Sequence, residues 1–466
     1  MVRALIFALC VAVPFAAKAE NVVPTSQAQI SLSFAPLVKQ AAPAVVNIYA
    51  KRIVQTRASA SPFASDPFFQ NFFGDLGPSR PQVQNSLGSG VILSSDGYVV
   101  SNYHVVGQAT DIRVVLKDRR EFSAEVILGD EASDLAILRL KNMDEATDNL
   151  PFLNLRDSNT VEVGELVLAI GNPFGVGQTV SSGIISGLAR SGKVTGNARG
   201  YFMQTDAPIN PGNSGGALIG MDGALIGVNT AIVTRSGGSN GIGFAIPAAM
   251  VEQFIEQARA GATLFQRPWA GMGGQTVDAD LAQSLGLDRS GGMAITQLQD
   301  GSPFAAAGLA VGDVITAANG LEVNSPSEML YYMTIAGMGS KIEVSFVHNG
   351  QEASTTVAMI GPPDIPAHEE VILEEDEVLP LLKLANVNPA VLSEHQLPLL
   401  PEGVVVLDTG PFGGRVGLQK GDILREINGD TIETPRAAQK AFRDARRSVS
   451  MVVERGGQLV LLRFRL

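Results

Sequence analysis

The sequence is almost without cysteine. Cys10 is the only cysteine among 466 residues, and it lies in a stretch that we expect to be absent from the mature chain. A mature chain without cysteine can form no disulfide and no metal site built on cysteine. Its stability must therefore come from core burial and assembly.

The first residues have the features of a signal peptide. Arg3 makes a short positive start, residues 4–17 are apolar, and Ala17-Lys18-Ala19 supplies small residues before Glu20. We predict a cleavable signal peptide over residues 1–19. A membrane anchor is the alternative, but this run is too short for a comfortable span. We expect no stable membrane span after the signal is removed.

Basic residues are fewer than acidic ones. The chain has 34 Lys and Arg against 46 Asp and Glu. Loss of Arg3 and Lys18 leaves 32 basic residues against the same 46 acidic ones, a net charge of −14. This balance argues against nucleic acid as a partner, because phosphate binding needs basic surface. Several acidic residues gather within residues 361–383, a stretch rich in Pro and Glu that we predict to be a solvated linker.

Histidine is scarce too, which limits how Gly212-Asn213-Ser214-Gly215-Gly216 could act. A nucleophilic serine needs a base, usually histidine, and an acid that orients the base. Of the four histidines, only His104 precedes Ser214. Asp134 lies between the two, and Asp111 and Asp130 are also available as acids.

Two other interpretations of this glycine-rich motif exist. It fits the Gly-x-Ser-x-Gly elbow of α/β hydrolases, but that chain order needs a base after the serine. The later histidines all lie far downstream: His348, His368 and His395. The other alternative is a tight loop without catalytic function. The order His, Asp, Ser favours the chymotrypsin-like arrangement.

Length and pattern indicate about three domains. Short apolar runs broken by glycine fill residues 40–247, which predicts an all-β barrel or sandwich. Helical periodicity is clear at residues 248–260. Residues 47–87 interrupt the β pattern and contain two Phe-Phe pairs, Phe68-Phe69 and Phe72-Phe73. These pairs indicate either a buried helical turn or a loop that docks on a neighbouring subunit.

The C-terminal part contains an internal repeat. Gly308-Leu309 with Gly312-Asp313 recurs as Gly417-Leu418 with Gly421-Asp422, at a constant offset that also relates two Asn-Gly pairs. Two copies indicate two tandem domains rather than a solenoid, which needs more and shorter units.

These motifs together resemble the HtrA (Deg) family of serine proteases, of the bacterial periplasmic Do-like type with two PDZ domains. The resemblance covers nearly the whole chain. Residues 205–218 are similar to the family's nucleophile loop, residues 101–105 to its base motif, residues 134–138 to its acid motif and residues 241–247 to its last barrel strand. Pro208 stands where the family usually has alanine, and Ser101 replaces a common threonine.

The resemblance implies a mainly β fold, in which a chymotrypsin-like double β-barrel protease domain is followed by two PDZ domains (α+β, partly open β-barrels). It places the protease domain at residues 20–267, with a regulatory loop at about 57–87. The first PDZ domain is expected at 268–360 and the second at 384–466. In the family the loop reaches from one subunit into another's active site, which implies a homotrimer or a multiple of trimers.

The resemblance also implies the site. The Asp-Leu-Ala match selects Asp134 as the acid beside His104 and Ser214. Backbone amides at Gly212 and Ser214, with Asn213 between them, are expected to form the oxyanion hole. A small apolar pocket and an edge that pairs with the substrate strand are expected from Ile209, Thr230, Ala231, Ile232, Val233 and Thr234. Core packing is the alternative for the two isoleucines. No metal ion and no cofactor are implied.

The first PDZ copy carries a candidate carboxylate-binding loop at Gly271, Met272 and Gly273, which would capture C-terminal peptides. A structural module is the rival interpretation. In the second copy we assign this loop to residues 384–388, which contain no glycine, so the sequence leaves ligand binding there open.

The function that follows is an ATP-independent serine endopeptidase that degrades misfolded or damaged proteins in the bacterial periplasm. PDZ domains would capture and regulate, with unfolded polypeptides and C-terminal peptides as partners. The alternative is a periplasmic chaperone or scaffold that holds unfolded clients with little proteolysis.

Overall fold

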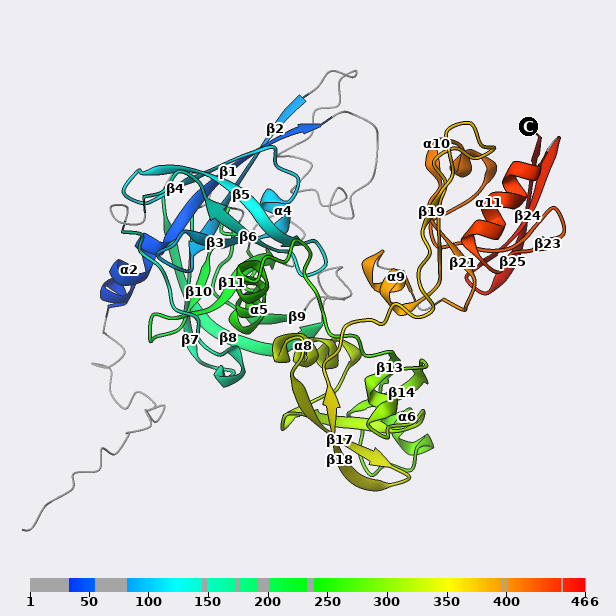
Figure 1. Cartoon of the computed structure of the whole chain (residues 1–466). Coiled ribbons are helices and arrows are strands. Elements are labelled where there is room, and N and C mark those ends of the chain that lie inside the picture. The colour runs from blue at the N-terminus through cyan, green and yellow to red at the C-terminus, as the bar shows by residue number, and fades with distance from the viewer. Residues whose placement is uncertain are drawn as a thin grey trace, which may run out of the picture.

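The computed structural model describes residues 33–54, 82–144, 149–172, 177–191, 201–210, 212–232, 239–395, 397–398, 400–445 and 447–465. The predicted signal peptide and the two Phe-Phe pairs lie outside them. Two barrels come first along the chain, and two smaller mixed domains follow in yellow-green and in orange to red (Figure 1). No helix among the described residues is long and apolar enough to cross a membrane.

The first barrel closes six strands in the order β1-β2-β3-β6-β5-β4. Burial alternates along its strands: in β4, Ile112 and Val114 point inward while Asp111 and Arg113 face out, as a half-buried strand requires. Helix α2 (Ala35–Ala41) precedes the barrel and the short α4 (Tyr103–Val106) follows β3. The strands are β1 (Val45–Val54), β2 (Gln82–Ile92), β3 (Tyr98–Ser101), β4 (Asp111–Val115), β5 (Glu121–Asp130) and β6 (Leu135–Leu140).

The second barrel closes six further strands in the order β10-β11-β12-β9-β8-β7. Helix α5 (Ala248–Arg259) follows directly and buries Met250, Val251 and Phe254, as the helical periodicity predicts. The strands are β7 (Leu166–Gly171), β8 (Thr179–Ser191), β9 (Tyr201–Thr205), β10 (Ala217–Ile219), β11 (Leu225–Ile232) and β12 (Gly243–Pro247).

One boundary differs from the expectation. The regulatory loop was expected at about 57–87, but residues 82–87 belong to β2, which pairs with β1 from Val54↔Gln82 to Val45↔Val91. Backbone pairing satisfies the N–H and C=O groups of this stretch whatever its side chains are, so polar residues such as Gln82, Gln84 and Asn85 need not end the strand.

The two C-terminal domains repeat one order of elements. The longest helix of each domain starts in the same way, with a hydroxyl side chain as N-cap and proline at the first helical position. Ser325 accepts from Glu328 N in one domain, and Thr434 accepts from Ala437 N in the other. This confirms the predicted repeat.

The first domain contains β13 (Met272–Thr276), α6 (Ala279–Ser284), β14 (Met293–Leu298), α7 (Pro303–Ala306), β15 (Val314–Ala318), β16 (Leu321–Glu322), α8 (Pro326–Ala336), β17 (Lys341–His348) and β18 (Gln351–Ala358). The second contains β19 (Val371–Ile372), β20 (Lys383–Asn386), α9 (Pro389–Glu394), β21 (Val404–Asp408), α10 (Gly410–Gly413), β22 (Ile423–Ile427), β23 (Asp430–Thr431), α11 (Pro435–Asp444), β24 (Ser448–Arg455) and β25 (Gln458–Arg465).

The stretch 361–383 differs from the expected solvated linker. It contributes strand β19 to the second domain's sheet, and Leu373 and Leu379 are buried in that domain's core. Backbone hydrogen bonds also attach both ends of the short connection between the two domains. Ile360 O accepts from Trp269 N in the first domain, and Pro363 O accepts from Ala390 N in the second. Four acidic residues of the stretch pair with basic side chains, which the sequence pattern does not reveal: Glu369, Glu370, Glu374 and Glu377.

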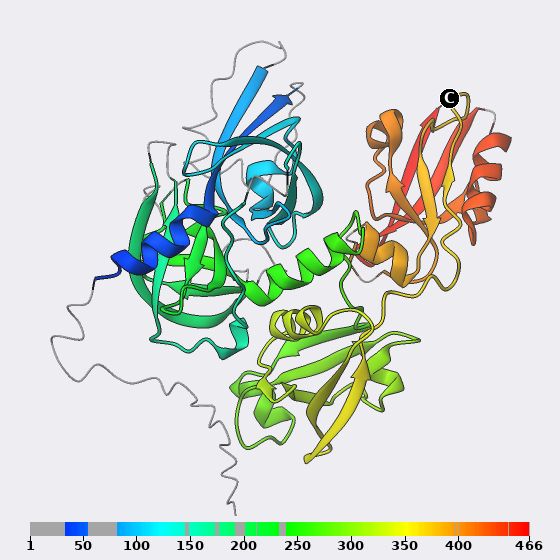
Figure 2. The same cartoon turned by 60° about the vertical axis from the view of Figure 1, so that its left-hand side comes forward.

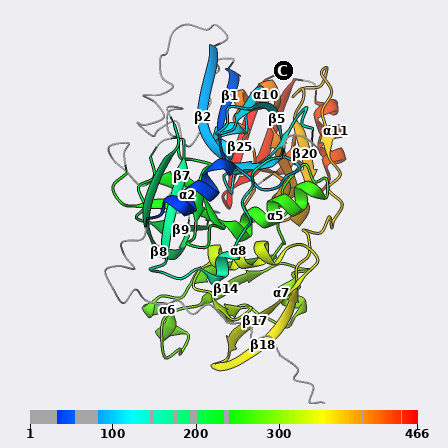
Figure 3. The ribbon, with the colours of Figure 1, turned by 90° about the vertical axis from the view of Figure 1, so that its left-hand side faces the viewer.

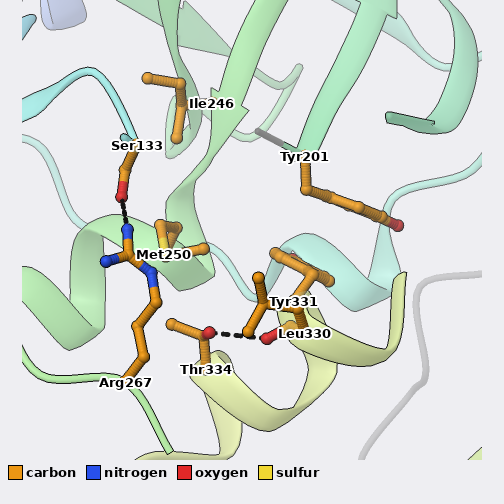
Figure 4. A pocket seen from close by; sticks show the side chains of 8 residues that line it. All are labelled: Ser133, Tyr201, Ile246, Met250, Arg267, Leu330, Tyr331 and Thr334. Atoms are coloured by element: carbon orange, nitrogen blue, oxygen red, sulfur yellow. Dashed lines mark hydrogen bonds between the residues drawn. The ribbon is translucent and has the colours of Figure 1, made fainter. Parts of the chain in front are cut away.

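The first PDZ-like domain lies against the barrels. Helix α5 lies between them and α8 (Figure 2), and the Tyr201 and Tyr331 rings stack with centroids 3.7 Å apart. Arg267, just before the domain, donates to Asp130 at 2.5 Å and to Ser133. Figure 4 shows Arg267 bonded to Ser133 on one side of a small pocket, with Tyr201 and Tyr331 on the other side. Figure 3 shows the same order of barrels, α5 and α8 from the side.

We predict that Arg267→Ala destabilises the protease domain. Asp130 and Arg267 side chains are 10% and 17% exposed, and removal of one partner of such a buried pair costs about 3–5 kcal/mol. Urea unfolding can be followed by far-ultraviolet circular dichroism. The paired variant Asp130→Asn with Arg267→Met is the control and should recover most of the loss. An unchanged midpoint in Arg267→Ala would contradict the prediction.

Candidate active site

His104 and Asp134 meet at the first barrel's inner edge. His104 lies in α4, directly after β3, and Asp134 ends the turn before β6 with a left-handed φ of 55°. His104 Nδ1 lies 2.9 Å from both carboxylate oxygens of Asp134, and His104 N donates to Oδ1 at 3.0 Å. The main-chain oxygen of Asp134 accepts from Tyr103 N and from the buried Asn102 side chain. Asp134 thus holds the imidazole at Nδ1.

Thr230 connects this pair to the second barrel. Its hydroxyl donates to Asp134 Oδ2 at 2.6 Å, and its main-chain oxygen accepts from Ser214 Oγ at 3.0 Å. Thr230 is only 6% exposed. One residue of β11 therefore contacts both the acid and the serine, across the boundary between the barrels.

The loop that carries Ser214 is fastened to the first barrel. Ser214 O accepts from Ser89 N at 2.9 Å, and Gly212 O accepts from Ser89 Oγ at 2.7 Å. Gly215 has a φ of 82°, and a Cβ there would lie 2.1 Å from Ser89 O. Glycine is therefore required at 215 by both conformation and close approach.

The backbone amides of this loop fall into two groups. Those of Asn213, Gly215 and Gly216 donate to main-chain oxygens. Those of Gly212 and Ser214 have no acceptor among the residues that the structure describes. Asn213 is buried and its side-chain oxygen accepts from Thr179, so Asn213 positions the loop. Two unpaired amides beside a serine are the donors that an oxyanion site needs.

Electrostatics favour a charged form of His104. Burial lowers the pKa of the imidazole, but the negative charge of Asp134 and the hydrogen bond to it outweigh burial, so the pKa of His104 is raised.

The rival acids are occupied elsewhere. Asp130 pairs with Arg267 and Ser133. Burial raises the pKa of Asp130, but the charge of Arg267 and the hydrogen bonds from both partners outweigh it and hold that pKa low. Asp111 lies on the surface, 3.6 Å from Lys51. Neither carboxylate contacts His104 in the bonds described, whereas Asp134 does.

The other predicted residues are placed unevenly. Ile209 is 2% exposed and belongs to the buried cluster of the second barrel with Ala207 and Leu218. The backbone of Ala231 and Ile232 lies in β11. Val233 and Thr234 lie outside the described residues. In the first PDZ-like domain Gly271 has a φ of 58°, while Met272 and Gly273 already belong to β13.

Three residues have positioning roles that the sequence motifs do not indicate. Ser89 fastens the Ser214 loop, Asn102 holds the Asp134 backbone, and Thr230 bridges acid and serine. Asn102 could be suspected from its place two residues before His104. For Ser89 the sequence offers no signal, because its role depends on a strand of one barrel meeting a loop of the other.

Comparison with known proteins agrees with this geometry. Residues 88–228 match the trypsin-like peptidase domain family and residues 270–359 the PDZ domain family. The chain is 36% identical over 439 residues to the periplasmic pH-dependent serine endoprotease DegQ of Escherichia coli (strain K12), covering 93% of this chain and 91% of that one. It is 37% identical over 427 residues to a probable periplasmic serine endoprotease, DegP-like, of Halomonas elongata, covering 88% of each. The chain belongs to the HtrA family of serine endoproteases.

A solved structure supports the assignment. The HtrA-type protease AlgW with a decapeptide has a TM-score of 0.52 and 39% identity to this HtrA chain, covering 71% of it and 99% of that chain. The predicted fold class is therefore confirmed: a double-barrel trypsin-like domain followed by PDZ architecture. The serine endoprotease prediction is confirmed with it.

We predict that Asp134→Asn lowers the pKa of His104. The negative charge of Asp134 raises that pKa, so a neutral amide removes the effect. In the parent, activity should therefore fall as pH drops through a His104 pKa above its ordinary value of about 6.5. Imidazole NMR titration is practical with four histidines.

The matched control for this titration is Asp111→Asn, the same change in an exposed carboxylate 3.6 Å from Lys51. It should leave the His104 titration in place. A His104 pKa that is the same in Asp134→Asn and the parent would refute the electrostatic coupling.

Proposed function

We propose that this endoprotease cuts misfolded or damaged polypeptides with Ser214 as nucleophile, His104 as general base and Asp134 as the acid that orients the base. The observation that supports the triad is the Asp134 carboxylate, which binds His104 Nδ1 and the hydroxyl of Thr230, while Thr230 O accepts from Ser214 Oγ. Both relatives above are named endoproteases, which favours this function over a chaperone or scaffold.

The proposed reaction begins with a proton transfer from Ser214. The Ser214 hydroxyl hydrogen turns from Thr230 O towards His104 Nε2 as Oγ attacks the peptide carbonyl. Asp134 keeps Nδ1 protonated, so that Nε2 is the basic nitrogen, and it stabilises the imidazolium that forms. His104 then gives the proton to the leaving amine, and water repeats the sequence on the acyl-enzyme.

The developing oxyanion would be bound by the amides of Gly212 and Ser214. Their lack of acceptors among the described residues leaves both N–H groups available. Fixed donors of this kind contribute about 3–4 kcal/mol each to transition-state binding.

The substrate strand would pair along β11. The pairing of β11 with β12 shifts between Asn229 and Ile232, so Thr230 and Ala231 are released from the ladder beside Ser214. Backbone pairing accepts many sequences, which suits unfolded chains. Ile209 and Ile232 would give the primary pocket its apolar character, and Val233 and Thr234 would continue the edge that pairs with the substrate.

Location and partners are inferred from the relatives and the sequence. Those relatives are named periplasmic, and residues 1–19 have signal-peptide character. We place this protease in the periplasm, assembled as a homotrimer or a multiple of trimers. Its first PDZ domain would capture apolar C-termini at Gly271, Met272 and Gly273 and so regulate cleavage.

We predict that Ser214→Ala abolishes casein cleavage while the fold is retained, because the hydroxyl is needed only for chemistry. Loss is expected to be on the order of 10⁶-fold, as when a triad serine is removed. Gel-based digestion gives the activity and circular dichroism the fold. Thr179→Ala, which removes a hydroxyl from the loop's support alone, serves as comparison. Cleavage by Ser214→Ala within tenfold of the parent would rule out the triad.

We predict cleavage mainly after Val and Ile. An apolar pocket offers no partner to a charged side chain, and burial of an unpaired charge is costly. Mass spectrometry of digested casein reads the cut sites directly. A majority of cuts after Lys or Arg would overturn the pocket assignment, while leaving the triad untouched.

A further inference from the structure

The second PDZ domain has one strand that the first lacks. The first domain's sheet runs β13-β14-β15-β17-β18, whereas the second runs β19-β20-β21-β22-β24-β25. Strand β20 of the second domain is the counterpart of β13 in the first. β13 is the edge strand of its sheet among the described residues, whereas β20 is covered by β19. Figure 1 shows β19 along the side of the second domain.

This edge is where a PDZ domain receives a peptide. The peptide adds a strand to the sheet, and its C-terminal carboxylate is bound by backbone amides of the loop before the edge strand. A peptide with its end at that loop must run antiparallel to the edge strand. Strand β19 runs in this sense, with Val371↔Leu384 and Ile372↔Lys383. Its C-terminal end therefore lies at the loop.

The loop itself shows the correspondence. Sheet pairing makes Gly273, opposite Gln297, equivalent to Lys383, opposite Asp408, so Gly271 corresponds to Leu381. Both have left-handed φ angles, 58° and 60°. The loop thus lies at residues 381–383 and not at 384–388, where the sequence analysis placed it. A leucine holds the conformation that glycine holds in the first domain.

Residue 373 sits where a peptide's last residue would sit. Leu381 N donates to Leu373 O at 3.1 Å, and Leu373 N donates to Leu382 O at 2.9 Å. The Leu373 side chain is fully buried with Leu384, Ala438 and Phe442. Its neighbour Ile372 is 52% exposed, so the side chains alternate as in a bound strand.

Ion pairs fix the segment along α11. Glu369 pairs with Arg436 near the start of the helix, at 2.9 Å, and Glu377 pairs with Arg443 near its end, at 2.6 Å. The Glu377 side chain is 4% exposed. The segment therefore lies between β20 and α11, both of which it contacts.

We propose that residues 371–373 are an internal ligand that fills the peptide groove of the second PDZ domain. The carbonyl of Leu373 replaces a terminal carboxylate and the Leu373 side chain fills the apolar pocket. In the intact chain this groove is closed to free C-terminal peptides, and it accepts an apolar C-terminus only when the segment is displaced. Peptide capture by the first domain belongs to the proposed function, on which this closure does not depend.

The test counts bound peptides per chain. Full-length Ser214→Ala protein, which should not cut the probe, is titrated calorimetrically with an octapeptide ending in a free leucine. Leu373→Glu puts a charge into the apolar pocket and should release the segment. Ile372→Glu adds the same charge one residue away on the exposed side and is the matched control.

We expect Leu373→Glu to bind one more peptide per chain than both Ile372→Glu and the parent. Equal numbers in all three proteins would overturn the proposal. If the first domain captures no peptide, the parent binds none, but Leu373→Glu still binds one peptide per chain. Failure of peptide capture by the first domain is therefore distinguishable from failure of this proposal.

A second variant covers the case in which Leu373→Glu does not fold. Ile372→Cys with Lys383→Cys joins two directly paired positions in a mature chain expected to contain no other cysteine. We expect the disulfide to form with and without peptide, and the number of bound peptides to be equal in the oxidised and reduced forms. A peptide that blocks the disulfide, or a binding site that oxidation removes, would show that the segment leaves the groove and would overturn the proposal.

Discussion

The Asp134 carboxylate has to be satisfied by donors from two separate barrels. A buried carboxylate without donors is costly, and here the ring and backbone of His104 supply donors from one side and Thr230 from the other. Strand β11 must place the Thr230 hydroxyl within hydrogen-bonding distance of Asp134. The strand register of the second barrel therefore depends on the position of the turn that carries Asp134 in the first barrel. The site exists only when both barrels have closed and met.

A second constraint works on the serine loop. Ser89 receives or donates three hydrogen bonds that join β2 to the Ser214 loop and to Asn172. Gly215 permits this approach, since any side chain there would collide with the Ser89 backbone. The amides of Gly212 and Ser214 are thus held near a fixed strand, although neither is used by the barrel itself.

Much of this could be predicted where a signal is local. Alternation in β4, the periodicity of α5 and the two Gly-Leu-x-x-Gly-Asp copies lie within short stretches, and so do the segments around His104, Asp134 and Ser214. The roles of Ser89 and Thr230 could not be predicted, because each depends on contact between distant strands. Strand β19 and Leu373 place three apolar residues between Glu370 and Glu374. The basic residues that pair with the glutamates of this stretch come from β20 and α11, which only folding brings close. The sequence analysis misplaced the carboxylate loop of the second domain because it looked for glycine there. The left-handed conformation of Gly271 is taken by Leu381 in the second domain.

The bonds at the junction of the PDZ domains determine how far they can separate. Ile360 is tied to the first domain and Pro363 to the second, which leaves Gly361 and Pro362 between the anchors. Two residues span at most about 7 Å when fully extended, and proline removes one of the backbone rotations. The acidic stretch therefore belongs to the second domain and is no long tether, and Gly361 and Pro362 alone connect the two domains. While both bonds hold, the second domain can turn relative to the first only about this short connection.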